Sequence, residues 1–154
     1  MKPKPYSILL VDDEISILRS IKLSLTKRGY KVDTANNGEQ AVEMLGKAPY
    51  DLVISDLLMP GISGMEVLKE TKKTNPDTIV IILTAHGTTD SLINAKRNGV
   101  TDYILKPVVS ADLHFRISTC LEKQGLQKQI KELQTKLAQY EGSGKQQEAP
   151  QEPA

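Results

Sequence analysis

The sequence predicts an α/β protein with a doubly wound, five-stranded parallel sheet and a C-terminal helical extension. Three observations support this prediction. Short, β-branched apolar runs alternate with segments of helical periodicity over residues 1–122. The clearest run, Ile79 to Leu83, is apolar throughout, which is typical of a strand covered on both faces. After Gly125 the pattern changes to one long amphipathic segment rich in Gln and Lys.

Five apolar runs predict the five strands of the sheet. Such runs, separated by segments long enough for a helix, favour parallel strands joined by helical crossovers. The expected strands are Tyr6–Val11, Lys31–Ala35, Asp51–Ser55, Thr78–Leu83 and Thr101–Leu105.

Each segment after a run carries signals for a helix start, a helix face or a helix end. The first helix has an apolar face of Ile17, Ile21 and Leu25 and ends before Gly29, and the second follows Asn37 with Ala41, Met44 and Leu45. A capping box from Ser63 to Glu66 opens the third helix. The fourth contains Leu92, Ile93 and Ala95 and ends before Asn98, and Ser110 starts the fifth. Five helices are therefore expected, one after each strand.

The segment 123–140 predicts an amphipathic helix with a narrow apolar seam. Its large apolar residues follow 4-3-4-3 spacing, the a/d pattern of a short coiled coil. They are Leu126, Ile130, Leu133, Leu137 and Tyr140. Two interpretations are open: a homodimer formed through residues 121–140, or a helix folded back on its own domain. Residues 141–154 contain no large apolar side chain and predict a disordered tail.

The composition is that of an ordinary globular chain. Of 154 residues, 39% are hydrophobic, and 20 Lys and Arg nearly balance 19 Asp and Glu, so no direct nucleic-acid or membrane binding is expected. Cys120 is the only cysteine, which excludes an intramolecular disulfide. The apolar run from Ile8 to Val11 is too short for a signal peptide or a membrane span. The protein is therefore expected in the cytoplasm.

Polar residues stand where the predicted strands end. Ligands of open parallel sheets bind at the carboxyl ends of the strands, so these side chains are expected to share one rim. They are Asp12 and Asp13 after the first strand, Asp56 after the third, Thr84 after the fourth and Lys106 after the fifth. Clustered carboxylates suit Mg2+, and together with a lysine and a hydroxyl they suit phosphoryl transfer. Asp56 stands alone on a central strand, which makes it the best candidate nucleophile.

Four segments resemble the receiver domains of two-component response regulators. They are residues 8–14 (ILLVDDE), 51–64 (DLVISDLLMPGISG), 82–85 (ILTA) and 102–107 (DYILKP), in the family's order and spacing. The resemblance covers residues 5–122 and implies the flavodoxin-like strand order 2-1-3-4-5.

The resemblance also implies a role for each matching residue. Asp56 would accept a phosphoryl group from a sensor histidine kinase or a phosphotransfer protein. Asp12, Asp13, Asp56 and the carbonyl of Leu58 would hold Mg2+, with Mn2+ as a substitute. Lys106 would pair with phosphoryl oxygens, preceding a cis bond to Pro107.

The same resemblance implies a switch. Thr84 would bind the new phosphate and Tyr103 would rotate behind it, altering the surface of the fourth helix, fifth strand and fifth helix, through which partners or a second copy bind. Leu58 and His86 stand where the family tunes the access of water to the phosphoryl group.

Other functions remain open. The chain fits a single-domain regulator acting through protein partners, but also the receiver part of a larger transcription activator. A phosphatase of the haloacid-dehalogenase type would need an acid two residues after its nucleophile, where this chain has Leu58. A scaffold that is never phosphorylated would have no use for the acids, Thr84 and Lys106 together. We therefore expect a signalling switch and not a turnover enzyme.

Overall fold

The computed structural model describes residues 4–85 and 87–147, with side chains described as far as residue 143. The chain forms two units, Met1–Ile117 and Ser118–Ala154. The first unit contains the predicted α/β domain. The helix α5 (Ser110–Gln147) begins in the first unit and continues into the second.

The sheet has five parallel strands in the order β2-β1-β3-β4-β5, which confirms the expected topology. Every strand boundary lies within one residue of its prediction. The strands are β1 (Ser7–Val11), β2 (Lys31–Ala35), β3 (Leu52–Asp56), β4 (Ile79–Thr84) and β5 (Asp102–Leu105).

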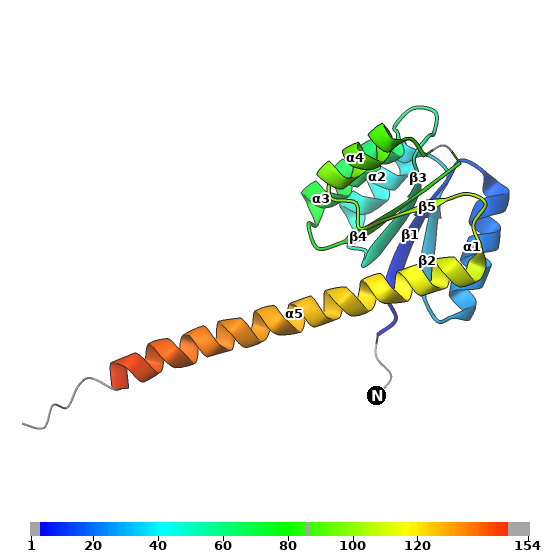
Figure 1. Ribbon diagram of the computed structural model, residues 1–154. Coiled ribbons are helices and arrows are strands. Elements are labelled where there is room, and N and C mark those ends of the chain that lie inside the picture. The colour runs from blue at the N-terminus through cyan, green and yellow to red at the C-terminus, as the bar shows by residue number, and fades with distance from the viewer. Residues whose placement is uncertain (1–3, 86, 148–154) are drawn as a thin grey trace, which may run out of the picture. The chain divides into compact units, whose positions relative to one another are not determined.

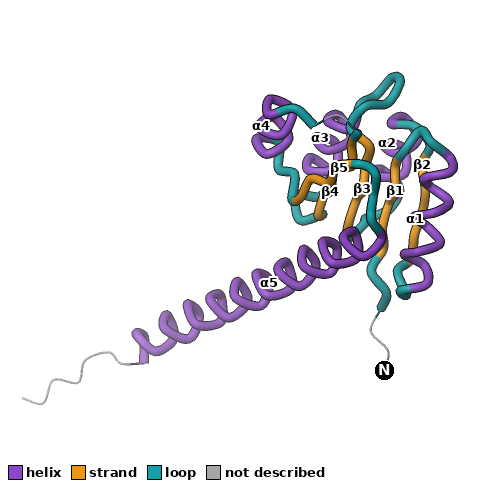
Figure 2. Tube along the Cα trace, turned by 45° about the vertical axis from the view of Figure 1, so that its right-hand side comes forward, coloured by secondary structure: helices purple, strands orange, loops and turns teal. Residues whose placement is uncertain are grey.

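Helices cover both faces of the sheet. Figures 1 and 2 show α1 and the first turns of α5 on one face, and α2, α3 and α4 on the other. Every residue of β3 and β4 is buried as a result. The first four helices are α1 (Ile15–Lys27), α2 (Gly38–Lys47), α3 (Gly64–Thr74) and α4 (Thr89–Arg97).

Two predicted helix starts have the expected side-chain caps. The side chain of Asn37 accepts a hydrogen bond from the backbone N–H of Gln40 at 2.7 Å. The hydroxyl of Ser63 accepts one from the N–H of Glu66 at 3.3 Å. Such caps satisfy backbone donors that the first turn of a helix leaves without a partner. They fix where α2 and α3 leave the rim of the sheet.

The register of the sheet brings the strand ends together. Val11 pairs with Ser55, so the residues that follow them, Asp12 and Asp56, are neighbours across two strands. Thr84 pairs with Leu105, so Lys106 follows directly beside it. The carboxyl ends of four strands therefore meet at one rim, as the sequence predicted.

The C-terminal helix differs from its prediction. A separate helix was expected over 123–140 with a tail from 141, but α5 is one helix that continues to Gln147. Adding residues to a helix that has already started costs little, and no proline lies between Ser110 and Pro150, so Gly125 and Gly142 are tolerated. The remaining predicted tail, 148–154, lies outside the described residues.

No helix in the described ranges is both long and apolar enough to cross a membrane.

Candidate functional site

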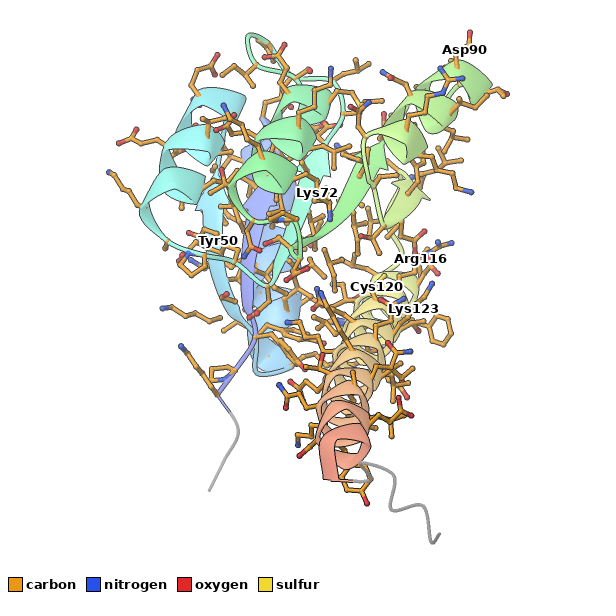
Figure 3. All side chains as sticks on the ribbon, turned by 90° about the vertical axis from the view of Figure 1, so that its left-hand side faces the viewer. Tyr50, Lys72, Asp90, Arg116, Cys120 and Lys123 are labelled. Atoms are coloured by element: carbon orange, nitrogen blue, oxygen red, sulfur yellow. The ribbon has the colours of Figure 1, made fainter. Side chains whose placement is uncertain are left out.

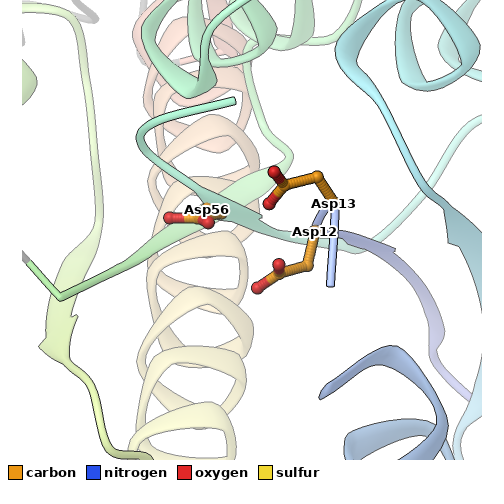
Figure 4. A group of neighbouring side chains, drawn as sticks. All are labelled: Asp12, Asp13 and Asp56. Carbon is orange, nitrogen blue, oxygen red and sulfur yellow. The ribbon is translucent and has the colours of Figure 1, made fainter. Parts of the chain in front are cut away.

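Three aspartates gather at the rim of the sheet. Each of Asp12, Asp13 and Asp56 offers a carboxylate oxygen, and these oxygens lie within 4.8 Å of one another (Figure 4). Asp12 and Asp56 are buried, while Asp13 is exposed. Two acids thus form the floor of the site, and the third borders solvent.

Both carboxylate oxygens of Asp12 are engaged. Its Oδ1 accepts a hydrogen bond from the backbone N–H of Glu14 at 2.9 Å. Its Oδ2 accepts one from the Nζ of Lys106 at 2.8 Å. These bonds compensate the burial of a charge that is fully removed from solvent.

Lys106 joins the two buried acids. Its Nζ lies 3.2 Å from the Oδ2 of Asp56, and 3.8 Å from the Oε1 of Glu14. Burial alone would lower the pKa of the Lys106 ammonium, but the hydrogen bonds and charges of Asp12 and Asp56 outweigh it and raise the pKa. The lysine is therefore held protonated at the site. The Lys106–Pro107 peptide bond is cis, as the resemblance implies.

The pKa of Asp56 lies above its ordinary value. Burial is the main cause, and the charge of Asp12 adds to it, while Lys106 and a backbone hydrogen bond from Leu58 act in the opposite direction. The pair with Lys106 alone would lower the pKa, so desolvation is the stronger effect here. A cation beside Asp56 would favour the ionised form, which is the form that can act as a nucleophile.

Close packing fixes the backbone around Asp56. The N–H of Gly64 donates to the carbonyl of Leu57 at 2.9 Å. A side chain at Gly64 would overlap with the carbonyl oxygen of Asp56. The start of α3 can approach the site this closely only because residue 64 is glycine.

Thr84 lies between the strands that carry the acid and the lysine. It is buried at the end of β4, and its carbonyl accepts the backbone N–H of Lys106 at 2.8 Å. Leu58 follows in the loop after β3 with 58% of its surface exposed. The sequence therefore identified Asp12, Asp13, Asp56, Thr84 and Lys106 as one group, and the structure brings them to one rim. His86 lies outside the described residues.

Tyr103 is partly buried on β5, next to α4. Its hydroxyl lies 3.3 Å from the Oγ of Ser91. Ser91 also forms a reciprocal cap with Thr88 at the start of α4. Ser91 was not predicted as part of the site; its spacing of three residues from Thr88 is a capping signal that could have placed it at the helix start.

The donor set fits a small, hard cation. Three carboxylates that converge from two strands repel one another unless positive charge lies among them, and Lys106 supplies only one charge. Mg2+ prefers oxygen ligands, uses few carboxylates and retains several waters, and the exposed position of Asp13 leaves room for water.

Comparison with known proteins agrees with this fold and site. Residues 8–118 match the response regulator receiver domain. The chain belongs to this family, whose members act in two-component signalling and bind Mg2+ at an acidic pocket.

Relatives in sequence are transcriptional regulators. The chain is 41% identical over 123 residues to the transcriptional regulatory protein GlrR of Escherichia coli K12, covering 80% of this chain and 28% of GlrR. It is 36% identical to the uncharacterized transcriptional regulatory protein YkoG of Bacillus subtilis 168, covering 77% of this chain and 52% of YkoG. The chain thus spans about a quarter to a half of these relatives.

Solved structures show the same fold. The CheY-like receiver domain protein of Methanospirillum hungatei JF-1 superposes with a TM-score of 0.79 at 28% identity, covering 80% of this chain and 99% of that one. NtrX of Brucella abortus superposes with a TM-score of 0.78 at 28% identity, covering 84% of this chain and 30% of NtrX.

Proposed function

We propose that this protein is a phosphoacceptor switch that receives a phosphoryl group on Asp56 from a phosphohistidine. The donor is a sensor histidine kinase or a phosphotransfer protein, in accord with the family. The observation that carries the proposal is the group of three carboxylates within 4.8 Å of one another with Lys106 hydrogen-bonded to two of them. The phosphoryl donors of this chemistry derive from ATP, so we also propose a cytoplasmic location.

The roles of the residues follow from their positions. A carboxylate oxygen of Asp56 attacks phosphorus, the phosphorus–nitrogen bond breaks, and the histidine leaves with the electron pair. Asp12, Asp13, Asp56 and the carbonyl of Leu58 would hold Mg2+, or Mn2+ in its place. When bound, the cation neutralises phosphoryl oxygens. Lys106, whose Nζ lies 3.2 Å from the Oδ2 of Asp56, adds a fixed ammonium group.

The response to phosphorylation is transmitted by Thr84 and Tyr103. The Thr84 hydroxyl would bind a phosphoryl oxygen, and Tyr103 would turn toward the vacated space and leave Ser91. This movement would alter the surface formed by α4, β5 and the first turns of α5. Leu92, Ile93 and Leu105 are 40%, 46% and 58% exposed there, which provides an apolar area for a partner protein.

Phosphorylation of Asp56 does not by itself determine what the whole protein regulates. The relatives are named as transcriptional regulators, so the receiver part of a longer activator and a stand-alone regulator are both compatible with the chain. The lack of direct nucleic-acid binding by residues 1–154 stays a prediction, which an electrophoretic mobility assay at low salt would test.

We propose a signalling switch and not a turnover phosphatase because of Leu58. A general acid is needed two residues after an aspartate nucleophile in haloacid-dehalogenase chemistry, and an exposed leucine cannot donate a proton. Repeated turnover of p-nitrophenyl phosphate would contradict this.

The proposal is tested by mass spectrometry of the intact protein after incubation with acetyl phosphate and Mg2+. We expect the gain of one phosphoryl group, which is lost with EDTA and in Asp56→Asn. The matched control is Asp90→Asn, an exposed aspartate in the first turn of α4 (Figure 3), which should still be phosphorylated. No gain in the wild-type protein, or the same gain in Asp56→Asn, would refute the proposal.

A further inference from the structure

We propose that a cavity between the second half of α1 and the start of α5 binds a small molecule through its phosphate monoester group. The two helices lie side by side there (Figures 1 and 2). Ser24, Lys27 and Arg28 line the cavity from α1, and Ser110 and His114 line it from α5. All of them lie in the first of the two units of the chain. The proposal goes beyond the phosphoacceptor function, because none of these residues belongs to the acidic site.

The cavity has the size of a small-molecule site. Its volume is about 500 Å³, within the range of about 300 to 1,000 Å³ that is typical of such sites. The acids and this cavity lie toward opposite ends of α1, whose 13 residues from Ile15 to Lys27 measure about 20 Å. The cavity is therefore a separate place from the acidic site.

The charges that line the cavity are positive. Lys27 and Arg28 supply two cations, and none of the described lining residues is an acid. No carboxylate in the described ranges lies within ion-pair distance of either cation. A phosphate monoester carries a charge of about −1.5 to −2 at pH 7, which two cations match.

The charge of Arg28 reaches the buried side of the cavity. His114 forms that side, with 8% of its surface exposed. Burial, and then the charge of Arg28, lower the pKa of His114. A cation that disfavours the charge of a buried ring lies close to that ring, so the same cation can stabilise an anion in front of it.

Hydroxyl groups supply hydrogen-bond donors. The Oγ of Ser24 lies 2.9 Å from the Oγ of Ser110 and 2.8 Å from the Nε2 of His114. In the tautomer with a proton on Nε2, His114 donates to Ser24 and Ser24 donates to Ser110, which leaves the exposed Ser110 hydroxyl to donate to a ligand. Ser110 is also the first residue of α5, where the positive end of the helix dipole favours an anion.

This combination of groups favours a phosphate over a carboxylate. The planar guanidinium of Arg28 can bind two phosphate oxygens, while the ammonium of Lys27 acts as a point charge on a third. A carboxylate has one charge and two oxygens, so it would use only part of this set. Because the cavity is much larger than a phosphate ion, an organic part of the ligand also has room in it.

Binding is tested by an NMR titration of the full chain in Mg2+-free buffer at pH 7.5 and constant ionic strength. The reporter is the ring of His114, which His114→Gln distinguishes from the only other histidine. The probes are glucose 6-phosphate, glycerol 3-phosphate and AMP, with glucose and inorganic phosphate as controls. We expect a saturable shift with at least one ester, with a Kd of about 1 mM or below. Inorganic phosphate should bind at least about fivefold more weakly because it leaves most of the cavity empty, and glucose should not bind.

The charges are tested by substitution. Lys27→Gln and Arg28→Gln should each weaken binding about fivefold or more, because each removes one of the two matching charges. Arg19→Gln and Lys22→Gln remove the same charge from the same helix but line a different hollow, so they are the matched controls and should change the affinity by less than about twofold. Asp56→Asn should bind as wild type does, which separates this proposal from the phosphoacceptor function.

The donor is tested by Ser110→Ala, which removes an exposed hydroxyl and should weaken binding about threefold or more. The proposal is overturned if none of the three esters gives a saturable shift up to about 20 mM. Equal losses in the cavity variants and in the Arg19 and Lys22 controls would overturn it too, because they indicate attraction to a basic helix in general. Inorganic phosphate that binds as tightly as the esters would make the free ion the occupant and would exclude the phosphorylated small molecule.

Discussion

The Nζ of Lys106 lies closer to Asp12 than to Asp56, at 2.8 Å against 3.2 Å from the nearest Oδ2. Asp12 thus anchors the lysine, while Asp56 receives the weaker bond. An incoming phosphoryl oxygen can therefore take the place of the Asp56 oxygen without displacing the lysine from its anchor. Under the proposed phosphoryl transfer, this anchor would keep the ammonium in place before and after the reaction.

Removing this ammonium should destabilise the domain. Lys106→Met leaves Asp12 and Asp56 buried without their shared cation, and we expect the free energy of unfolding in EDTA to fall by about 2 to 4 kcal/mol. Asp12→Asn in the same chain should recover part of the loss because it removes one of the repelling charges. The control is Lys47→Met, which breaks an exposed pair with Glu43 and should change little. Urea denaturation measures all three. Equal losses in Lys106→Met and Lys47→Met would show that the buried group is not stabilised by its lysine.

A methyl group at residue 64 should disturb the site. Gly64→Ala would press on the carbonyl oxygen of Asp56, so we expect a loss of about 1 to 3 kcal/mol in unfolding free energy and slower phosphorylation by acetyl phosphate. The matched control is Gly46→Ala in α2, where nothing lies near the added methyl group. There the better helix propensity of alanine should leave stability equal or raised by up to about 1 kcal/mol. If Gly64→Ala is phosphorylated as fast as wild type, the close contact between residue 64 and the carbonyl of Asp56 does not affect phosphorylation.

Stability should depend on the protonation of His114. Its Nε2 lies 2.8 Å from the Oγ of Ser24, which is also 2.9 Å from the Oγ of Ser110, and this cluster joins α1 to the start of α5. Burial, and then the charge of Arg28, lower the pKa of His114 below its ordinary value of 6.5. The folded state therefore binds this proton less readily than the unfolded state does. The stabilisation is present above pH 6.5 and is lost as the pH falls through the lower folded pKa.

His114→Gln should make the decline in stability shallower between about pH 8 and 5, measured by urea denaturation at each pH. His86→Gln replaces the only other histidine of the chain and serves as the control. The prediction is wrong if His114→Gln loses stability with the same pH dependence as wild type and His86→Gln.

The exposed leucine beside the site should prolong the phosphorylated state. Leu58 cannot position a water molecule, whereas an amide can, so Leu58→Asn should speed the loss of phosphate by about tenfold, the effect of one hydrogen bond of about 1.4 kcal/mol. Decay of a ^32P-labelled protein measures this rate. Leu23→Asn alters a leucine of similar exposure on α1 and should leave the rate unchanged. If Leu58→Asn loses phosphate at the wild-type rate, Leu58 does not control the access of water to the phosphoryl group.

The sheet and the position of the site were predictable from the sequence because burial sets the pattern. Strands covered on both faces read as unbroken apolar runs, and polar residues directly after such runs fall at one rim whatever the helices do. Asp56 and Thr84 were identified in this way. The anchoring of Lys106 by Asp12 was not, because residues 94 positions apart meet only through the register of the whole sheet.

The C-terminal helix was less predictable. The tail was expected from residue 141 because the segment lacks large apolar residues, yet residues up to Gln147 are helical. Composition reports whether a segment can bury a core, whereas a helix that has already formed extends through polar residues at little cost. The contact of Ser91 with Tyr103 was missed for another reason: a hydroxyl in a helix cap carries no sequence signal for a tertiary partner.

The most direct test of the central claim locates the covalent phosphate. Protein treated with acetyl phosphate and Mg2+ is reduced with borohydride, which converts an aspartyl phosphate to homoserine, and the modified residue is identified by tandem mass spectrometry. We expect homoserine at position 56, only when Mg2+ is present, and none at positions 12 or 13. Homoserine at another aspartate, or formation at position 56 in the presence of EDTA, would contradict a cation-dependent phosphoacceptor at Asp56.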